Sequence, residues 1–330
     1  MTKTAAPMTS GSIWKQMTFF AMPIFLGNLF QQLYNTVDSL IVGNFLGSSA
    51  LAAVSSSGSL IFMLIGFLSG ISAGAGVIVA RFFGAGDEKN LQRAVHTTVA
   101  FGLVAGVLMT GVGVALSPQI LRWMDTPESV MRESVTYLQI YFAGSLGFVM
   151  YNVLVGILQA VGDSRHPLYY LIVSSVINLV LDLLFITGFH TGVGGAAVAT
   201  VISQIVSALL CFWQLLRTKE SYGLKIRKIR FDKGILVQII KIGLPSGVQN
   251  SIIAFANVIV QSNINAFGEM AMAGYGAYTK VEGFGFLPIN SFTMALTTFV
   301  GQNLGAKQEE RTRKGARFGI LAAVILAELI

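Results

Sequence analysis

Four polar side chains recur at intervals of three and four residues within an otherwise apolar segment: Asn28, Gln31, Asn35 and Asp38. This spacing places all four on one face of an α-helix. A carboxylate in the middle of a membrane helix costs about 2.5–3.5 kcal/mol or more on insertion, so a water-filled cavity or a bound cation best explains Asp38. The alternative is a structural aspartate that is hydrogen-bonded to neighbouring helices. Pro23 begins the stripe and predicts a bend, because proline removes a backbone donor.

A second polar cluster lies later in the chain, in the segment SSVINLVLDLLFI. Asn178 and Asp182 are four residues apart and therefore share a helix face. Thr200 follows about two turns into the next apolar segment. Two carboxylates, an amide and a hydroxyl supply hard oxygen ligands of the kind that suits a small cation. If Asp38 and Asp182 lie close together, they should titrate as one coupled unit that exchanges a proton for a metal ion.

The composition identifies the elements that must position these residues. Hydrophobic residues make up 54% of the 330-residue chain and charged residues 11%, against about 25% charged residues in a soluble domain. Apolar stretches long enough to cross a bilayer are predicted near 15–45, 50–83, 92–116, 132–159, 166–189, 195–216, 236–266, 271–302 and 312–330. They should be helical, because a helix satisfies its own backbone hydrogen bonds in lipid. The predicted fold class is an all-α polytopic membrane protein.

The positions of Lys and Arg predict the orientation. If the N-terminus is cytoplasmic, the inner segments hold every one of the 22 basic residues except Arg122, Arg132 and Lys280. We therefore attribute the net charge of +7 to basic residues that orient the protein in the membrane. The predicted location is the inner (plasma) membrane. A nucleic-acid partner is not expected, because the basic residues lie in loops between helices without interleaved aromatic residues.

The chain also contains an internal repeat. The motif RFFGAGDEKNLQR (81–93) returns as QNLGAKQEERTRK (302–314), 221 residues later. Six predicted spans separate the two copies, so both have the same orientation, which is the parallel-repeat plan of secondary transporters. This predicts an N-terminal lobe of six helices (1–216), a basic cytoplasmic linker (217–235) and a partial C-terminal lobe (236–330). A complete pair of six-helix repeats would have twelve helices, of which about nine are expected here, the ninth ending with the chain.

The second repeat departs from the first at the acidic residue. It repeats the proline and two asparagines of the stripe as Pro245, Asn250 and Asn257, but Val260 or Gln261 takes the place of Asp38. Ion coupling is therefore expected in the first lobe only. Residues that could line a substrate cavity in the second half are Asn250, Asn257, Gln261, Lys280 and Glu282. The last two could instead extend toward the outer membrane interface. A direct ion pair between them is not expected, because residues two apart point to different helix faces.

Three other function classes fit the sequence less well. A flippase for lipid-linked precursors should line its cavity with several Arg or Lys, yet Lys280 is the only base predicted well inside the membrane, away from the ends of a span. A channel or a non-transporting membrane fragment accounts poorly for duplicated halves and an unduplicated acid. An enzyme is least supported, because no nucleophile–base pair, metal-ligand spacing or phosphate-binding loop is present. Secondary transport is the leading interpretation.

The chain resembles the multidrug and toxic compound extrusion (MATE) transporters over nearly its whole length. The resemblance rests on the motifs MPIFLGNLFQQLYNTVDSLIVGNFLG, VARFFGAGD, GILQAVGDSRHP, NLVLDLLFI, GVGGAAVAT and TFVGQNLGA. It implies twelve helices in two lobes around a V-shaped cavity, a monomer, and export of cationic amphipathic compounds in exchange for sodium ions or protons, without a further cofactor.

The resemblance also implies a cation site in the first lobe. Carried over by position, its residues are Asp38, Asn178, Asp182 and Thr200, and Pro23 lies where the first helix of the family bends. Proton or sodium binding is expected to neutralise the two aspartates, shift the first helix near Pro23 and lower the affinity for drug. Other branches of the family carry a second-lobe glutamate on the seventh helix, where this chain has no acid.

Overall fold

The computed structural model describes residues 7–124, 126–265, 267 and 269–329, apart from some side chains in 48–63 and 258–280. Within these residues the chain forms α-helices joined by short turns and by one longer linker (218–232) with a 3-10 turn at Ile226–Lys228, without β-strands, so the predicted all-α fold class is confirmed. The α-helices are α1 (Ile13–Leu46), α2 (Ser48–Gly84), α3 (Glu88–Trp123), α4 (Glu128–Ala143), α5 (Ser145–Ala160), α6 (Arg165–Leu183), α7 (Gly192–Arg217), α8 (Lys233–Asn265), α9 (Glu269–Gly305) and α10 (Glu309–Leu329).

Each predicted span coincides with one helix, except that the fourth (132–159) is divided into α4 and α5. These helices meet at Gly144 with a bend of 48°. A Cβ atom on Gly144 would lie only 2.4 Å from the methyl carbons of Val201, so the break occurs where α7 packs tightly against it. The helix α6 continues into a π-helical turn, Leu184–Gly188.

The apolar character of the helices agrees with a membrane protein. Among the described residues, six helical segments are long and apolar enough to cross a bilayer, and the bent α4–α5 pair makes a seventh. The helix α1 falls short of this measure because of its polar stripe. The helix α10 falls short because its first turns carry six charged residues: Glu309, Glu310, Arg311, Arg313, Lys314 and Arg317.

The internal repeat is visible in the backbone of its turns. Ala85 N–H donates to the Arg81 carbonyl, and 221 residues later Ala306 N–H donates to the Gln302 carbonyl; the next two turn hydrogen bonds recur at the same offset. Gly86 has φ +66° in the first turn, and Lys307 has φ +57° at the same place in the second. The two sequence copies therefore fold into the same helix–turn–helix unit, which confirms the predicted repeat.

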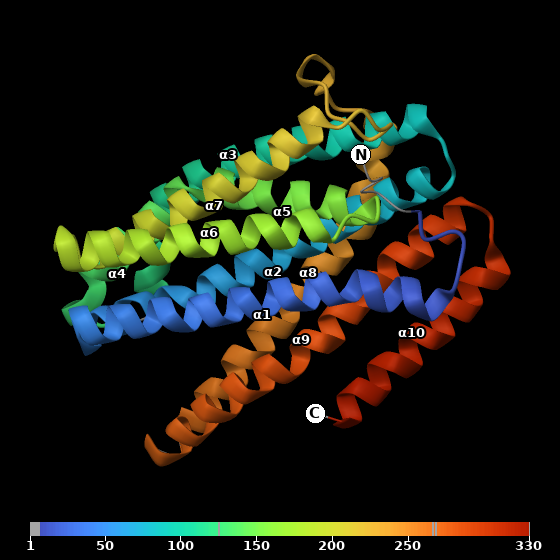
Figure 1. Ribbon diagram of the computed structural model, residues 1–330. Coiled ribbons are helices and arrows are strands. Elements are labelled where there is room, and N and C mark those ends of the chain that lie inside the picture. Colours follow the sequence, from blue (N-terminus) through green and yellow to red (C-terminus); the bar gives the residue numbers. More distant parts are fainter. Residues whose placement is uncertain (1–6, 125, 266, 268, 330) are drawn as a thin grey trace.

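We call α1–α7 the first lobe and α8–α10 the second lobe, after the predicted division; the two sets of helices meet at one end of the molecule and diverge toward the other. We call the end that holds the α2–α3, α5–α6 and α9–α10 turns and the α7–α8 linker the basic end, and the opposite end the distal end. Figure 1 shows α9 leaving α1, and α8 crossing α2, as they run toward the distal end. Gly70 and Gly74 of α2 lie against Gly247 and Gly243 of α8, where a Cβ on either α2 glycine would come within 2.4 Å of the α8 backbone. Small residues allow this close crossing of two membrane helices.

The largest apolar core lies mainly in the first lobe. It is formed by α2, α3, α5 and α7, with contributions from Leu171 of α6, from Tyr222 and Leu224 of the linker, and from Ile235 and Ile239 at the start of α8. The Tyr222 ring is fully buried and packs edge-on against Phe83 of α2. The linker, which was predicted only as a basic connection, is therefore anchored on the first lobe.

Candidate functional site

Two carboxyl groups meet inside the first lobe. Asp38 is in the second half of α1, and Asp182 is at the end of α6, next to the π-helical turn. The helices pack against each other, and the two carboxyl groups are close enough to share a hydrogen bond. Asp182 is 1% exposed and Asp38 is half-buried. The two acids that the sequence placed on separate helices therefore lie side by side.

The polar atoms of this acid pair lack partners. No described residue donates a hydrogen bond to either carboxylate oxygen of Asp182 or to Oδ1 of Asp38. The amide nitrogen of Asn178, one turn before Asp182 and 2% exposed, is also without an acceptor. Leaving a buried polar group unsatisfied costs about 1–3 kcal/mol, and more for a charged group. A small cation or a proton between the carboxylates would remove much of this cost.

Thr200 is half-buried on α7, which packs against both α1 and α6. Its hydroxyl donates to the Ala196 carbonyl at 3.0 Å rather than to either aspartate. Because the proton is used in this way, the hydroxyl oxygen keeps its lone pairs free as acceptors or cation ligands. Asn178 and Thr200 therefore fit the predicted neutral oxygen ligands by chemistry and by helix.

Three residues beside the acid pair were not selected from the sequence: Tyr34, Tyr137 and Gln204. The Tyr34 hydroxyl lies beside the side-chain amides of Gln31 and Gln204, and both tyrosines are within electrostatic range of the two aspartates. Helical spacing could have found Tyr34, since it lies four residues before Asp38 on the same face. Gln204 likewise follows Thr200 by four residues. Tyr137 comes from α4 and carries no signal of this kind.

A second feature is a cavity of about 690 Å³ between the lobes. It is lined by α1, α2, α5 and α6 from the first lobe and by α8 and α9 from the second. Four predicted residues line it: Pro23, Asn28, Gln31 and Asn250. None of the described residues around this cavity is charged. Its surface combines amide and hydroxyl groups with apolar and aromatic side chains.

Two repeat-related asparagines connect the lobes at the cavity. Asn28 of α1 donates to the Ser291 hydroxyl of α9 at 3.2 Å. Asn250 of α8 donates to the Gly66 carbonyl of α2 at 3.0 Å. Each asparagine thus reaches from the first helix of its own repeat to the second helix of the other. The repeat explains why both positions line the cavity.

The remaining predicted residues lie elsewhere. Asn35 and Asn257 are exposed and do not line the cavity. Glu282 is half-buried and accepts a hydrogen bond from the Tyr278 hydroxyl at 2.9 Å. The side chains of Gln261 and Lys280 lie outside the described residues.

The lobes are joined tightly at the basic end. A Cβ on Gly84 would lie 1.9 Å from the Gln302 carbonyl oxygen, and a Cβ on its repeat partner Gly305 would lie 1.9 Å from the Arg81 carbonyl oxygen. Gln302 is fully buried and donates to the Ala160 carbonyl at 2.8 Å. The cavity is therefore separated from the basic end by a packed contact between the two repeats.

A segment that includes the start of α1 (residues 8–16, the N-terminal latch) reinforces this contact. Met8 N–H donates to the Gln302 side chain at 2.7 Å, and Asn303 donates to the Met8 carbonyl at 3.1 Å. The guanidinium of Arg311 on α10 donates to the Gly11 carbonyl at 2.7 Å and to the Gln16 side chain at 2.8 Å. The latch thus ties the start of the first lobe to the second lobe.

Comparisons with known proteins agree with this geometry. The family model described as MatE matches residues 23–184 and 245–330. The chain is 33% identical over 326 residues to the "Probable multidrug resistance protein YoeA" of Bacillus subtilis, covering 97% of this chain and 70% of that protein. It is 22% identical over 315 residues to the "Multidrug export protein MepA" of Staphylococcus aureus, covering 96% and 68%.

Solved structures give the same result. A structure described as "MATE in the bent conformation" superposes with a TM-score of 0.90 at 26% identity, covering 99% of this chain and 73% of that one. A second structure, described as the "outward-facing conformation of a multidrug resistance MATE family transporter", has a TM-score of 0.91 at 26% identity, covering 99% and 72%.

Proposed function

The chain belongs to the MATE family of multidrug efflux transporters, and we propose that it is a secondary active antiporter that exports cationic amphipathic compounds. The driving ion is sodium or a proton, and it binds at the acid pair formed by Asp38 and Asp182. The single observation that carries this proposal is that the buried carboxylates face each other without a described hydrogen-bond donor.

The acid pair is suited to bind one positive charge reversibly. Two carboxylates at close range repel each other, and burial makes each charge more costly. A proton shared between them, or a sodium ion held by their oxygens, relieves both penalties. The amide of Asn178 and the hydroxyl of Thr200 would complete an oxygen ligand set for sodium. Because binding is reversible, the site releases its cation when the cation concentration is low on the side of the membrane to which the site is open.

The helix α1 links this site to the cavity. Asp38 belongs to the acid pair, Gln31 lines the cavity, and Tyr34 lies between them on the same face and beside the Gln31 amide. A ligand shifts a conformational equilibrium only through its different affinities for the two states. Neutralising Asp38 changes the hydrogen bonds that its side chain can make. Pro23 has no N–H to donate to the carbonyl four residues earlier, so α1 can bend at this point. Cation binding is thereby coupled to the shape of the cavity.

The cavity surface supports an amphipathic substrate. Amide and hydroxyl oxygens can solvate a cationic head, and aromatic rings such as Tyr151 and Phe148 offer faces for a cation or an apolar body. A pyrophosphate head would need several bases, but none of the described residues that line the cavity is Lys or Arg. This favours drug export over a lipid-linked precursor flippase.

The proposed placement in the membrane follows from the basic end. Lys and Arg concentrate in its turns and linker, and such residues are retained on the cytoplasmic side. The N-terminus is therefore placed in the cytoplasm, with the protein in the plasma membrane. In this orientation the packed contact between the repeats closes the cytoplasmic side, and the structure represents a state that faces outward.

Efflux of a fluorescent cation from vesicles that contain the full-length protein tests this proposal, with sodium and pH gradients imposed separately. We expect one of the gradients to drive transport. Asp38→Asn and Asp182→Asn should each abolish gradient-driven efflux without reducing the amount of folded protein. Glu310→Gln is the matched control, because it makes the same carboxyl-to-amide change at an exposed ion pair with Lys314. Gradient-driven efflux that persists in both aspartate variants would refute the assignment.

A further inference from the structure

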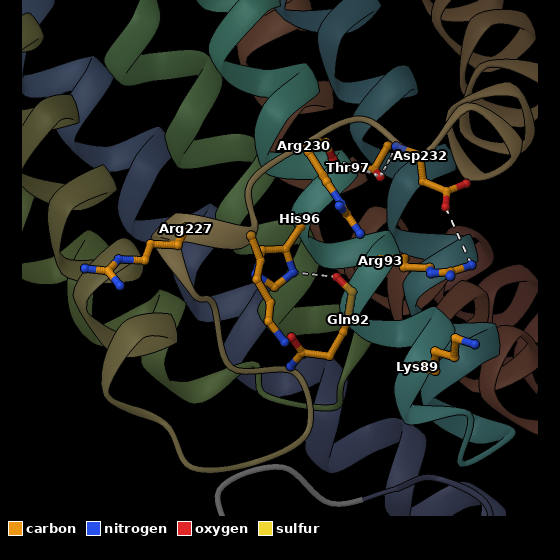
Figure 2. A pocket seen from close by; sticks show the side chains of 9 residues that line it. Lys89, Gln92, Arg93, His96, Thr97, Arg227, Arg230 and Asp232 are labelled. Atoms are coloured by element: carbon orange, nitrogen blue, oxygen red, sulfur yellow. Dashed lines mark hydrogen bonds and ion pairs between the residues drawn. The ribbon is translucent and has the colours of Figure 1, made fainter.

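A separate pocket of about 470 Å³ opens at the basic end, between the start of α3 and the α7–α8 linker. Five basic residues line it, with one acid, Asp232; the bases are Lys89, Arg93, Arg227, Lys228 and Arg230. Figure 2 shows Lys89, Arg93 and Arg230 on the same side of the pocket, whereas Arg227 points away from them. We call Lys89, Arg93 and Arg230 the basic triad. It lies outside the central cavity and the acid pair.

Hydrogen bonds fix the linker side of this pocket. Gln92 donates to the Gly223 carbonyl at 3.0 Å, and the Lys225 N–H donates to His96 Nε2 at 3.0 Å. His96 Nδ1 lies 2.6 Å from the Gln92 carbonyl. Because Nε2 accepts, Nδ1 must be the donor, so the imidazole is neutral and both of its nitrogens are used. The buried ring of His96 therefore holds the linker cations at a set position above α3.

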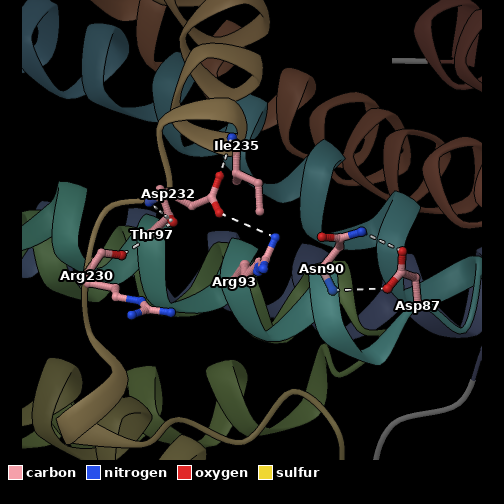
Figure 3. A network of polar contacts seen from close by, with 7 residues as sticks. All are labelled: Asp87, Asn90, Arg93, Thr97, Arg230, Asp232 and Ile235. Atoms are coloured by element: carbon pink, nitrogen blue, oxygen red, sulfur yellow. Dashed lines mark hydrogen bonds and ion pairs between the residues drawn. The ribbon is translucent and has the colours of Figure 1, made fainter.

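The start of α8 fixes the other side, as Figure 3 shows. The Asp232 N–H donates to the Thr97 hydroxyl at 3.0 Å, and Asp232 Oδ1 accepts from the Ile235 N–H at 3.1 Å as an N-terminal cap. Its other oxygen lies 3.7 Å from Arg93 Nη1, a long and half-exposed ion pair. One oxygen of this carboxylate caps the backbone of α8, and its single negative charge stands against five basic residues around the pocket.

The second nearby acid is also committed to a helix end. Asp87 caps α3 by accepting from the Asn90 N–H at 3.0 Å and from its side chain at 2.7 Å. These hydrogen bonds, with smaller contributions from Lys89 and Arg93, hold the pKa of Asp87 below its usual value. Among the described ion pairs, none involves Lys89 or Arg230. The pocket therefore has a surplus of fixed positive charge and a volume that accepts a multi-oxygen anion.

The surface of α3 below the pocket indicates which anion this is. Val104 and Val107 follow Arg93 by about three and four helical turns on the same face, and their side chains are 47% and 60% exposed. On α7, the exposed Trp213 ring lies 5.0 Å from the Arg217 guanidinium, an aromatic and basic pair that is typical of a membrane surface. A ligand with a phosphate in the pocket and acyl chains along α3 fits both features.

We propose that the basic triad binds the phosphate head group of an anionic phospholipid in the leaflet at the basic end. Arg93 and Arg230 offer guanidinium forks that match phosphate oxygens, and Lys89 adds a point charge. Basic pockets next to membrane helices commonly bind such head groups. Because the linker joins the lobes, the bound lipid bridges α3 and Arg230 and restrains the linker. This proposal does not depend on the transport mechanism.

Native mass spectrometry of the full-length protein, titrated with phosphatidylglycerol or phosphatidylcholine, tests the proposal. We expect tighter binding of phosphatidylglycerol, and its loss by roughly a hundredfold in the triple variant Lys89→Gln, Arg93→Gln, Arg230→Gln. The matched control is Arg313→Gln, Arg317→Gln, Lys314→Gln, which removes three exposed charges from α10 at the same end. It should keep the preference. The single change Arg230→Gln, at an exposed side chain, should weaken binding about fivefold. It keeps the test valid if the triple variant does not fold.

Three outcomes would overturn the proposal. Equal loss in the two triple variants would indicate nonspecific attraction to the whole basic end. Equal affinity for the two lipids would exclude recognition of an anionic head group. If inorganic phosphate alone displaces phosphatidylglycerol at millimolar concentration, and itself binds equally well in the absence of lipid, the pocket is a site for soluble phosphate.

Discussion

The contact between the two repeats at the basic end predicts the effect of a single methyl group. In Gly305→Ala the new Cβ would lie 1.9 Å from the Arg81 carbonyl oxygen, whereas ordinary contacts begin at 3.4 Å. The two backbones must therefore separate by about 1.5 Å, the difference between these distances. Gly84→Ala should act in the same way from the other lobe, because its Cβ would meet the Gln302 carbonyl oxygen.

The magnitude follows from the hydrogen bonds next to this contact. Gln302 joins Ala160 and Met8, and Asn303 also bonds Met8, at 2.7–3.1 Å. Three such bonds are worth about 1 kcal/mol each in net terms, so losing them weakens the closed contact by about 3 kcal/mol. This corresponds to a shift of roughly a hundredfold in the population ratio of closed and open states.

Distances between spin labels measure this shift directly. Glu88→Cys and Glu309→Cys place labels at repeat-equivalent, exposed positions on the two turns, while the native Cys211 is fully buried and stays unlabelled. We expect Gly305→Ala to add or enlarge a population at longer distance. Gly111→Ala is the control, because a Cβ there has nothing within 4 Å. An unchanged distance distribution in Gly305→Ala, with normal transport, would refute the argument.

Three further predictions concern the turns and the N-terminal latch. Arg311→Ala removes the guanidinium that holds residues 8–16 and should lower the stability by about 2 kcal/mol, measured by thermal unfolding in detergent. Lys307→Gly should raise stability by about 0.5 kcal/mol in the same assay, because relief of a left-handed φ of +57° outweighs the greater freedom of the unfolded chain; a decrease would contradict this. Asp87→Asn keeps the helix cap but removes the charge. Since the pKa of Asp87 is lowered, the advantage of the wild type should be present at neutral pH and disappear as the pH falls below about 4; an advantage that persists in acid would contradict it.

The helices could be predicted from the sequence because their signals are local. Apolar length located every helix except that it merged α4 and α5 into one span, and helical spacing placed Gln31 and Asp38 on one face of α1. The division at Gly144 could not be predicted in this way. The bend coincides with a close contact to Val201 on α7, and a glycine in an apolar run is equally compatible with an unbroken packed helix.

The candidate site was predictable only in part, for a related reason. Spacing within one helix shows which residues share a face, but it does not show which faces of two helices meet. Asp38 and Asp182 were therefore paired by chemistry and by family resemblance, and the packing of α1 on α6 supplies their proximity. Two further features depend on contacts between distant segments, which leave no pattern in a single sequence. They are the position of Tyr137 near the acid pair and the hydrogen bond that the linker makes to His96.

The reciprocal fit of Gly84 and Gly305 constrains how this protein can evolve. Each glycine makes room for the carbonyl of the opposite repeat, so neither half of the duplicated gene is free to acquire a side chain there alone. The two halves have diverged at Lys307, which replaces a glycine, and at the acid that the second half lacks. The paired contacts of Gly84 and Gly305, in contrast, require both halves to keep glycine. Chimaeras that exchange lobes between relatives should therefore assemble only when both donors carry glycine at these two positions.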